Sequence, residues 1–189
     1  MIGMKKQLRR NVLSHLANLN EQDKLFIEEK FYHTLFQTDI WKESSVIGTT
    51  YSTENEWNTK PIIERAWQDG KQIAIPKSNL QSKEMKFYEL NHFDDLIVGD
   101  YNIKEPKKNN QMIDKEIIDL LIVPGVVYNS SGYRIGFGGG FYDRFLSNFS
   151  GETVSLVASF QINELLPVEE HDLPVKYYIT EEKIMKITP

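Results

Sequence analysis

The chain has 189 residues, enough for one well-buried domain and too few for two ordinary ones, so we expect a single domain over residues 1–189. With 40% hydrophobic, 26% charged and 12% aromatic residues, the composition is that of a globular protein and excludes a disordered chain. A net charge of -5 argues against non-specific nucleic-acid binding, and the absence of cysteine excludes disulfides, thiolate metal sites and a cysteine nucleophile.

No stretch of the sequence is apolar for long enough to cross a membrane. The longest, at residues 120–128, has about nine residues and contains a Pro-Gly pair, whereas about 20 are needed. The basic residues near the N-terminus are followed by polar residues rather than by the apolar segment of a signal peptide. We therefore expect a cytoplasmic protein with no membrane partner.

Two helices are expected at the start of the chain. Apolar residues recur every four positions from Met4, which predicts a helix over residues 4–17. Asn20 is a favourable N-cap for a second helix, whose apolar residues continue to about residue 36. Because the connection is short, the two helices are expected to pack as a hairpin.

The remaining elements alternate between strands and helices, which favours an α/β fold class. The run IIDLLIV at residues 117–123 is almost continuously branched and apolar, as in a central parallel strand buried on both faces. We expect a mostly parallel central sheet sandwiched by helices, an open Rossmann-like sheet whose ligand lies beyond the end of that strand. The expected elements are strands at residues 45–51, 72–77, 85–90, 117–123, 154–160 and 177–180, a helix at 61–69 and a loop at 100–111.

The segment PGVVYNSSGYRIGFGGGFYDR, residues 124–144, carries the most informative pattern. Just before an expected helix, four glycines fall within five positions: Gly136, Gly138, Gly139 and Gly140. Glycines at this density let backbone N–H groups approach an anion, and a helix N-terminus favours phosphate. A flexible loop or a hairpin turn explains an isolated glycine run equally well, so this pattern alone leaves both interpretations open.

Two charged residues flank the glycine turn, residues 136–142. Arg134 precedes it and Asp143 follows it, so a cation that can pair with phosphate and a carboxylate that can bind Mg²⁺ bracket one anion-binding turn. The turn is not a Walker A loop, because Gly-Lys-Ser/Thr is absent, and not a dinucleotide motif, because Phe141 stands in place of the last glycine. As a residue that faces ligand, Arg134 is expected to make few core contacts.

The first helix carries a basic face. Lys5 and Arg9 lie four residues apart, as do Lys6 and Arg10, and like charges at this spacing repel each other. A polyphosphate bound across them would turn this cost into an advantage. The alternative is an ordinary solvated surface.

A third group of residues could recognise a flat heterocycle. Aromatic side chains with one or two carboxylates can form a pocket for a ring that bears N–H groups. The alternative is that most of these aromatic residues belong to the core. The group comprises Tyr51, Glu54, Glu56, Trp57, Phe87, Glu105 and Phe141.

The glycine turn also carries a family resemblance. The segment RIGFGGGFYDR, preceded by LIVPGVVYNSSGY, resembles the signature of the 5-formyltetrahydrofolate cyclo-ligase family, also called methenyltetrahydrofolate synthetases. Further stretches follow the family's order: KKQLR, ENEWNT, IPK, NIKEP and HDLPV. The resemblance therefore covers nearly the whole chain.

This resemblance implies an enzyme that uses ATP to cyclise 5-formyltetrahydrofolate to 5,10-methenyltetrahydrofolate, with release of ADP and phosphate. Because a formamide oxygen is a poor leaving group, ATP would phosphorylate it, and the neighbouring folate nitrogen would then attack the activated carbon and expel phosphate. The resemblance also implies ATP and Mg²⁺ as cofactors and a small-molecule folate substrate, with or without a polyglutamate tail. We expect a monomer with no nucleic-acid partner.

The resemblance assigns roles to individual residues. Arg134, Gly138 and Tyr142 fall at catalytic positions, and Asp143 and Asp172 fall at the Mg²⁺ positions. The positions that contact folate are Tyr51, Glu56, Phe87, Phe137 and Phe141. The positions that contact ATP are Lys5, Arg9, Arg134, Ile135, Gly136, Phe137, Gly138, Gly139, Gly140, Phe141 and Tyr142.

The chain departs from the family pattern at three positions. Some members carry basic residues where Phe137 and Gly139 stand, so this chain would neutralise the transferred phosphate with fewer side-chain cations and more backbone N–H groups. Where many members have Val-Asp, this chain has Val175-Lys176, which leaves Asp172 as the late carboxylate. Two other function classes stay open: a phosphosugar or CoA-ester enzyme on a related α/β scaffold, and a non-catalytic nucleotide-binding module.

Overall fold

The computed structural model describes residues 2–99, 103–107 and 109–188 of the chain. The helices are α1 (Ile2–Asn18), α2 (Glu21–Gln37), α3 (Asp39–Lys42), α4 (Lys60–Gln68) and α5 (Phe141–Leu146), with short 3₁₀ helices at Phe93–Asp95, Lys115–Ile117 and Ser159–Gln161. The strands are β1 (Val46–Gly48), β2 (Gln72–Asn79), β3 (Glu84–Glu89), β4 (Leu96–Val98), β5 (Lys104–Pro106), β6 (Met112–Ile113), β7 (Leu120–Ile122), β8 (Val127–Tyr128), β9 (Arg134–Ile135), β10 (Glu152–Leu156), β11 (Tyr177–Ile179) and β12 (Ile184–Lys186).

The central sheet has eight strands in the order β12-β11-β10-β7-β1-β2-β3-β6. Neighbouring strands from β11 to β2 are parallel, whereas β12, β3 and β6 pair antiparallel with their neighbours towards the two edges. This arrangement confirms the mostly parallel sheet and the interior place of the most apolar strand, β7. Two small hairpins, β4–β5 and β8–β9, pair outside this sheet.

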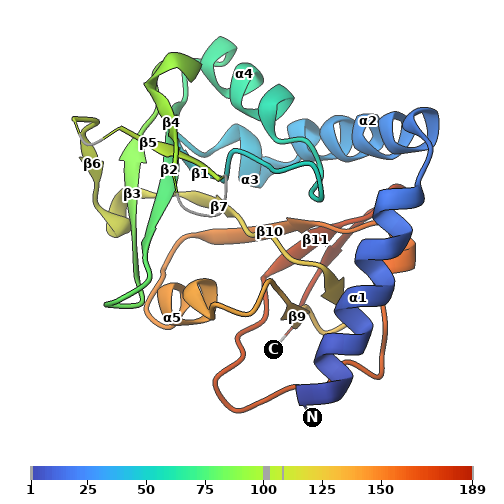
Figure 1. The fold of residues 1–189 in the computed structure, drawn as a ribbon. Coiled ribbons are helices and arrows are strands. Elements are labelled where there is room, and N and C mark those ends of the chain that lie inside the picture. The colour runs from blue at the N-terminus through green and yellow to red at the C-terminus, as the bar shows by residue number, and fades with distance from the viewer. Residues whose placement is uncertain (1, 100–102, 108, 189) are drawn as a thin grey trace.

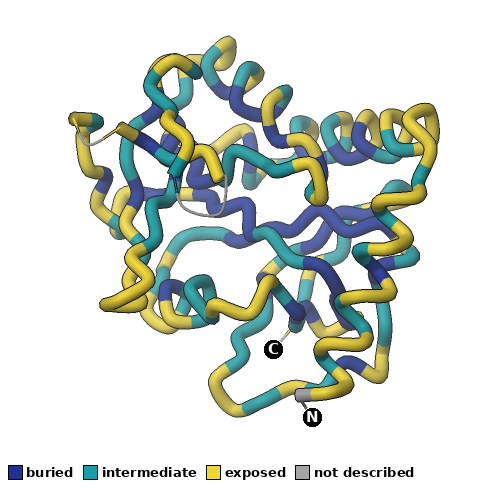
Figure 2. The backbone as a smooth tube through the Cα atoms, in the orientation of Figure 1, coloured by how far each residue is buried: buried dark blue, intermediate teal, exposed yellow. Residues whose placement is uncertain are grey.

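Helices cover both faces of the sheet, so the core has two layers (Figure 1). α2, α3 and α4 lie on one face and α5 on the other. Alternate residues of β7 supply both layers: Leu120 and Ile122 join the cluster beneath α2 to α4, whereas Leu121 joins the cluster that contains Phe145 of α5. Figure 2 shows that the central strands form the most continuously buried part of the backbone.

The predicted helix ends are confirmed where local signals set them. The Asn20 side chain accepts a hydrogen bond from the Asp23 backbone N–H at 2.8 Å and caps α2. Pro61 stands at the start of α4, and Gly70 just beyond its end has φ of +73°. Within the described ranges, no helix has the length and apolar character needed to pass through a membrane.

The expected hairpin of the first two helices is wrong. α1 packs instead on the β8–β9 hairpin, where Val12 joins a third apolar cluster with Val126, Val127 and Ile135. The buried apolar residues of α2, Phe31 and Leu35, face the central sheet, whereas Leu25 and Phe26 are exposed. Each helix therefore has its apolar stripe occupied by a different partner, and Figure 1 shows α1 running away from α2 at their junction.

The expected loop at residues 100–111 is partly wrong. Residues 100–102 and 108 lie outside the described part of the chain, but β5 pairs antiparallel with β4. The sequence of β5 is polar and has no apolar alternation that would predict a strand. It is a strand because β4 supplies its backbone hydrogen-bond partners. The strand expected at residues 154–160 is shorter, since β10 ends at Leu156 and a 3₁₀ turn follows.

Candidate active site

The glycine turn has a backbone that only glycine accommodates readily. Gly138 and Gly140 have φ of +102° and +62°, in the left-handed region where a Cβ atom is costly. A Cβ at Gly139 would lie 2.6 Å from the ring of Phe141. Gly138 and Gly140 therefore need the backbone freedom of glycine, and Gly139 lacks room for a side chain.

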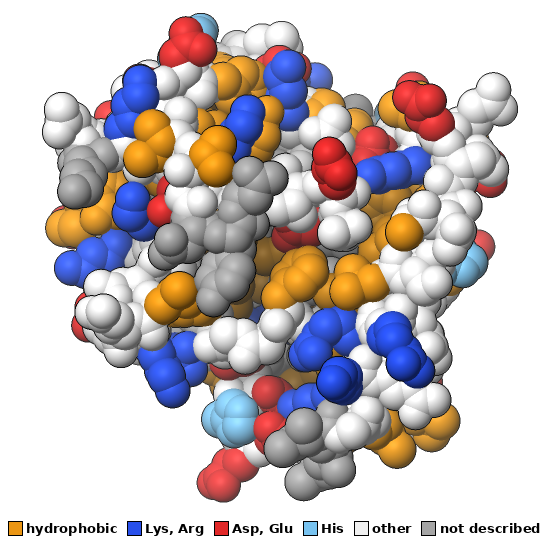
Figure 3. Space-filling view, in the orientation of Figure 1, with side chains coloured by type: hydrophobic (Ala, Val, Ile, Leu, Met, Phe, Trp, Pro, Cys, Tyr) orange, Lys and Arg blue, Asp and Glu red, His pale blue; other side chains and the backbone are white. Residues whose placement is uncertain are grey.

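The basic face of α1 lies against this turn. Arg9 Nε donates a hydrogen bond of 2.7 Å to the Gly136 carbonyl, and a terminal nitrogen of Arg9 is 3.7 Å from the position of a Cβ at Gly138. Figure 3 shows Lys and Arg side chains gathered on this face beside the N-terminal half of α1. The structure thus brings together two of the sequence-predicted groups, which are more than a hundred residues apart in the chain.

Lys5 joins α1 to the late acidic segment. Its Nζ donates to Asp172 Oδ2 at 2.8 Å and lies 3.3 Å from Glu169 Oε2. Burial disfavours the charges of both partners, but the hydrogen bonds and mutual attraction outweigh it, so the pKa of Lys5 is raised and the pKa of Asp172 is lowered. A cation and a carboxylate that were predicted separately are therefore an ion pair.

Arg134 is buried, and the expectation that it makes few protein contacts is wrong. It is 6% exposed, and its guanidinium donates to the Leu173 carbonyl at 2.6 Å and to Asp143 Oδ1 at 3.0 Å. The same Asp143 oxygen accepts a hydrogen bond of 3.2 Å from the Leu173 backbone N–H. The two charges that flank the glycine turn in sequence thus pair with each other and fix the late segment beside α5.

One cluster in the late segment has the composition of a cation site. Ligand atoms of Glu169, His171 and Asp172 lie within 4.8 Å of one another. Carboxylate oxygens are the ligands that Mg²⁺ prefers. Two of the three members are carboxylates, so the donor set fits a hard cation at Asp172; Asp143 is not part of this cluster and contacts the same segment through the Leu173 N–H.

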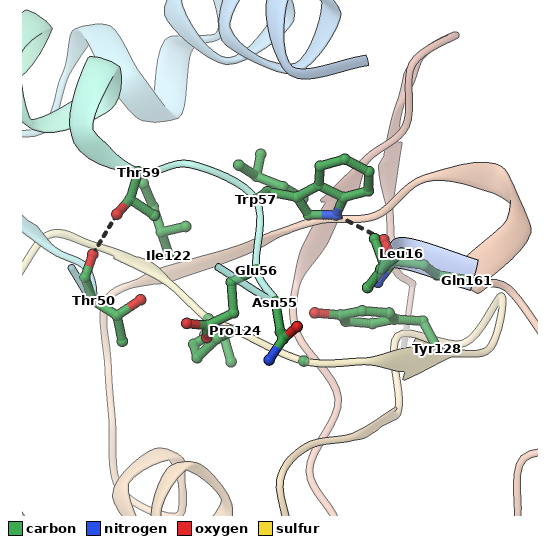
Figure 4. Close-up of a pocket in the computed structure, with 13 residues that line it drawn as sticks. Leu16, Thr50, Asn55, Glu56, Trp57, Thr59, Ile122, Pro124, Tyr128 and Gln161 are labelled. Atoms are coloured by element: carbon green, nitrogen blue, oxygen red, sulfur yellow. Dashed lines mark hydrogen bonds between the residues drawn. The ribbon is translucent and has the colours of Figure 1, made fainter. Parts of the chain in front are cut away.

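A pocket opens between the loop that precedes α4 and the segment that follows β7. Glu56 points into it, and its Oε2 accepts hydrogen bonds of 2.8 Å from both the backbone N–H and the hydroxyl of Thr53. Figure 4 shows Tyr128 on the opposite wall, with its hydroxyl directed towards Asn55 and Glu56. The residues that line the pocket include Thr50, Asn55, Glu56, Trp57, Thr59, Pro124, Gly125, Tyr128 and Gln161.

A buried glutamine holds the pocket walls together. Gln161, 1% exposed, accepts a 2.7 Å hydrogen bond from Trp57 Nε1 and a 2.9 Å bond from the Ala158 backbone N–H. Its amide donates to the Val126 carbonyl at 2.9 Å. Sequence reasoning missed Gln161, because no local pattern marks a side chain that binds two distant segments, at Trp57 and Val126, as well as its own turn.

Two buried tyrosines connect the pocket to the glycine turn. Burial raises the pKa of Tyr128 to about 12. Burial and the nearby Glu56 carboxylate raise the pKa of Tyr142, which the Arg134 guanidinium partly offsets. The Tyr142 hydroxyl is buried without a hydrogen-bond partner among the described residues. An unpaired buried hydroxyl is costly, so Tyr142 is a polar group whose partner the described residues do not supply. Sequence reasoning also missed Tyr128, which reads as part of an apolar strand.

The predicted folate-contacting residues lie in different environments. Phe87 is 1% exposed and packs against Phe145 at a centroid distance of 4.9 Å, so it belongs to the core and not to the pocket lining. Tyr51 follows the pocket residue Thr50 and lies beneath Lys104 Nζ, 4.8 Å from its ring centroid. Phe137, within the glycine turn, is 54% exposed.

Comparison with known proteins supports the family that the sequence resembles. A model of the 5-formyltetrahydrofolate cyclo-ligase family matches residues 1–181. The chain belongs to the 5-formyltetrahydrofolate cyclo-ligase family. It is therefore an enzyme of the cyclo-ligase family, which removes support for the phosphosugar, CoA-ester and non-catalytic alternatives.

Individual cyclo-ligases resemble the chain over most of its length. The 5-formyltetrahydrofolate cyclo-ligase of Escherichia coli strain K12 is 33% identical over 143 residues, 73% of this chain and 79% of that protein. The Haemophilus influenzae enzyme of the same name is 28% identical over 177 residues, 90% of this chain and 94% of its own.

Solved structures show the same fold. The NMR structure of Aquifex aeolicus 5,10-methenyltetrahydrofolate synthetase superposes with a TM-score of 0.86 at 30% identity, covering 98% of this chain and 94% of that one. The Mycoplasma pneumoniae 5,10-methenyltetrahydrofolate synthetase, at 21% identity and a TM-score of 0.73, covers 93% of this chain and 97% of its own and shows the fold alone.

Proposed function

We propose that this cyclo-ligase catalyses the ATP-dependent conversion of 5-formyltetrahydrofolate to 5,10-methenyltetrahydrofolate, with release of ADP and phosphate. The observation that carries the proposal is the Tyr142 hydroxyl, which is buried without a partner in the described structure and lies within the electrostatic reach of Glu56 and Arg134. It supports a site in which an acid suited to a heterocycle adjoins a turn suited to phosphate. A reaction that joins ATP to a folate needs these two half-sites to be adjacent.

The proposed chemistry has two steps. The formyl oxygen attacks the γ-phosphorus of ATP, so that an O–P bond forms and ADP leaves. The neighbouring folate nitrogen then attacks the formyl carbon and forms the new C–N bond, its proton passes to the departing phosphate or to water, and the C–O bond breaks as the oxygen leaves in phosphate. In neither step does a protein side chain need to become covalently bound, so the protein acts by positioning and by stabilising phosphoryl charge.

The proposed roles of the residues follow from their positions. The Glu56 carboxylate, oriented by Thr53, accepts hydrogen bonds from the folate ring. The backbone of the glycine turn and Arg9 bind the phosphates, because Arg9 lies on the turn and carries a cation to it. The Tyr142 hydroxyl contacts the reacting groups between the two.

We propose Asp143 and Asp172 as the residues that hold Mg²⁺. When bound, the ion would neutralise charge on the ATP phosphates. Lys5 now pairs with Asp172, so binding of the ion requires Lys5 to exchange this carboxylate for a phosphate oxygen. We further propose that residues 1–189 act as one catalytic unit, in the cytoplasm and as a monomer, on folates with or without a polyglutamate tail.

One assay tests the proposed reaction. The protein is incubated with 5-formyltetrahydrofolate and MgATP while the near-ultraviolet absorbance of the methenyl product is followed. We expect product only when folate, ATP and Mg²⁺ are all present. Turnover in EDTA without nucleotide would contradict the proposed ligase reaction.

A further inference from the structure

A stripe of polar side chains on α2 forms hydrogen bonds with the backbone of the pocket loop, residues 53–59. Lys24, Glu28 and Tyr32 follow one another at four-residue spacing and therefore share one face of the helix. Lys24 Nζ donates to the Glu54 carbonyl at 3.3 Å. Glu28 Oε1 accepts from the Asn58 backbone N–H at 2.9 Å, and the Tyr32 hydroxyl donates to the Asn58 carbonyl at 2.5 Å. Both backbone polar groups of Asn58 are thus bound by one helix.

Glu28 is an unusual residue for this task. It is 4% exposed, and among the described residues its carboxylate has a single hydrogen-bond partner, the Asn58 N–H. Burying a carboxylate costs free energy, which the Asn58 N–H and the positive charge of Lys24 offset in part. Burial accordingly raises the pKa of Glu28. A buried acid that costs stability at this position is explained if it serves to fix the position of the pocket loop.

The loop that Glu28 holds carries the acid of the pocket. Glu56 lies two residues before Asn58, and its orientation depends on the short turn from Thr53. On the inner side, Trp57 is fixed by its hydrogen bond to Gln161. The loop is therefore held by the core at Trp57 and by α2 at Asn58. Glu56 lies between the turn at Thr53 and these two anchored residues, and its side chain points into the pocket.

We propose that Glu28, assisted by Tyr32, is a positioning residue for the folate half of the site: it fixes the Asn58 backbone and thereby sets the position of the Glu56 carboxylate. This inference rests on the proposed function. The phosphate half depends on α1 and the glycine turn, and in the described residues no hydrogen bond joins α2 to that turn. Glu28 therefore controls folate recognition separately from ATP recognition.

The test is the split between the two Michaelis constants. Glu28→Ala is expected to raise the KM for 5-formyltetrahydrofolate by about tenfold and to leave the KM for ATP within about twofold, because the freed Asn58 N–H lets the loop shift. Glu28→Gln is expected to restore the folate KM, since an amide oxygen accepts the same hydrogen bond. The matched control is Glu29→Ala, at the neighbouring exposed position, which should change neither constant.

A double-mutant cycle identifies the residue through which Glu28 acts. In a Glu56→Ala background, Glu28→Ala is expected to add less than about twofold to the folate KM, because the group that it positions is absent. If Glu28→Ala does not fold, Tyr32→Phe removes the hydrogen bond to the Asn58 carbonyl and is expected to raise the folate KM by about threefold.

Several outcomes would overturn the proposal. Glu28 would be only a structural residue if both KM values rose equally or if the effects of Glu28→Ala and Glu56→Ala were additive. The same conclusion would follow if Glu28→Ala lowered the thermal stability and left the folate KM unchanged. If the wild type makes no methenyl product, the proposed reaction fails. The positioning role is then judged by equilibrium binding of 5-formyltetrahydrofolate, where an equal Kd for wild type and Glu28→Ala would reject it.

Discussion

At the residue scale, the buried pair of Arg134 and Asp143 combines a structural contact with a position in the site. The Arg134 side chain reaches both the Leu173 carbonyl and Asp143, so it links β9, α5 and the late segment. An arginine fork suits this geometry because it can bind two acceptors at once. The remaining exposed fraction of Asp143 leaves an oxygen for another partner.

Arg134→Ala is therefore expected to lose stability as well as activity. Removing the buried guanidinium leaves the Asp143 carboxylate, which is 20% exposed, without its charge partner, and this costs up to about 3 kcal/mol. Denaturant unfolding measures this loss, and kcat for methenyl formation should also fall by about 10³-fold. Arg10→Ala, an exposed change of the same type, is the control. A fully stable Arg134→Ala protein would show that the pair has no structural role.

Tyr142→Phe is expected to separate stability from activity in the opposite direction. The hydroxyl lacks a partner in the described structure, so its removal should leave the unliganded protein as stable or about 1 kcal/mol more stable. If the hydroxyl contacts substrate, kcat/KM should fall by about tenfold or more. A thermal melt and a measurement of kcat/KM on the same preparation test both expectations. A destabilised variant with full activity would refute this interpretation.

At the element scale, α1 supplies the phosphate half of the site because its apolar stripe packs on the β8–β9 hairpin. Val12 buries against that hairpin, and Arg9, three residues earlier and therefore on the neighbouring part of the same side of the helix, reaches the glycine turn. The same helix therefore fills a cluster of the core and delivers a cation. α2 serves the folate half in a similar way, through the stripe that holds the pocket loop.

Arg9→Ala is expected to raise the KM for ATP by about tenfold and to leave the KM for folate nearly unchanged, because the lost guanidinium is proposed to bind the phosphates and donates to the Gly136 carbonyl rather than to a residue of the folate pocket. Steady-state kinetics with each substrate varied in turn measures the difference. Arg10→Ala again serves as the control, since it lies one position further along the same helix and is exposed. An unchanged KM for ATP would show that the basic face of α1 is an ordinary solvated surface.

At the scale of the whole molecule, the site lies where segments from the entire chain meet. α1, the pocket loop, the glycine turn and the late segment are held together by contacts such as Lys5 with Asp172, which are 167 residues apart. Ligands that bind across these segments should stabilise the folded state as a whole, because they bind the native arrangement and not the unfolded chain.

ATP with Mg²⁺, and separately 5-formyltetrahydrofolate, are each expected to raise Tm by about 5 to 10 °C when present at about 100 times Kd. EDTA should reduce the shift caused by ATP and leave the folate shift intact, because only the nucleotide is proposed to bind through the metal. Differential scanning fluorimetry in the four conditions tests this. An ATP shift that is unaffected by EDTA would argue against Asp143 and Asp172 as metal-holding residues.

The sequence by itself determined the local elements and the family of this protein. The Asn20 cap, Pro61 and Gly70 at the ends of α4, and the apolar run of β7 are short-range signals, because helix ends and strand burial depend on a few neighbouring residues. The glycine turn was equally readable, since its crowding arises from adjacent residues.

Only the tertiary structure decided which residues meet. The partner of α1, the pairing of Arg134 with Asp143 and Leu173, the core position of Phe87 and the junction made by Gln161 all depend on contacts between distant segments. The hydrophobic pattern states that a side chain is buried but not against what, because the hydrophobic effect is non-directional. Packing between distant segments determines which partner each buried side chain has. It also determines which acid and which cations come together in the site.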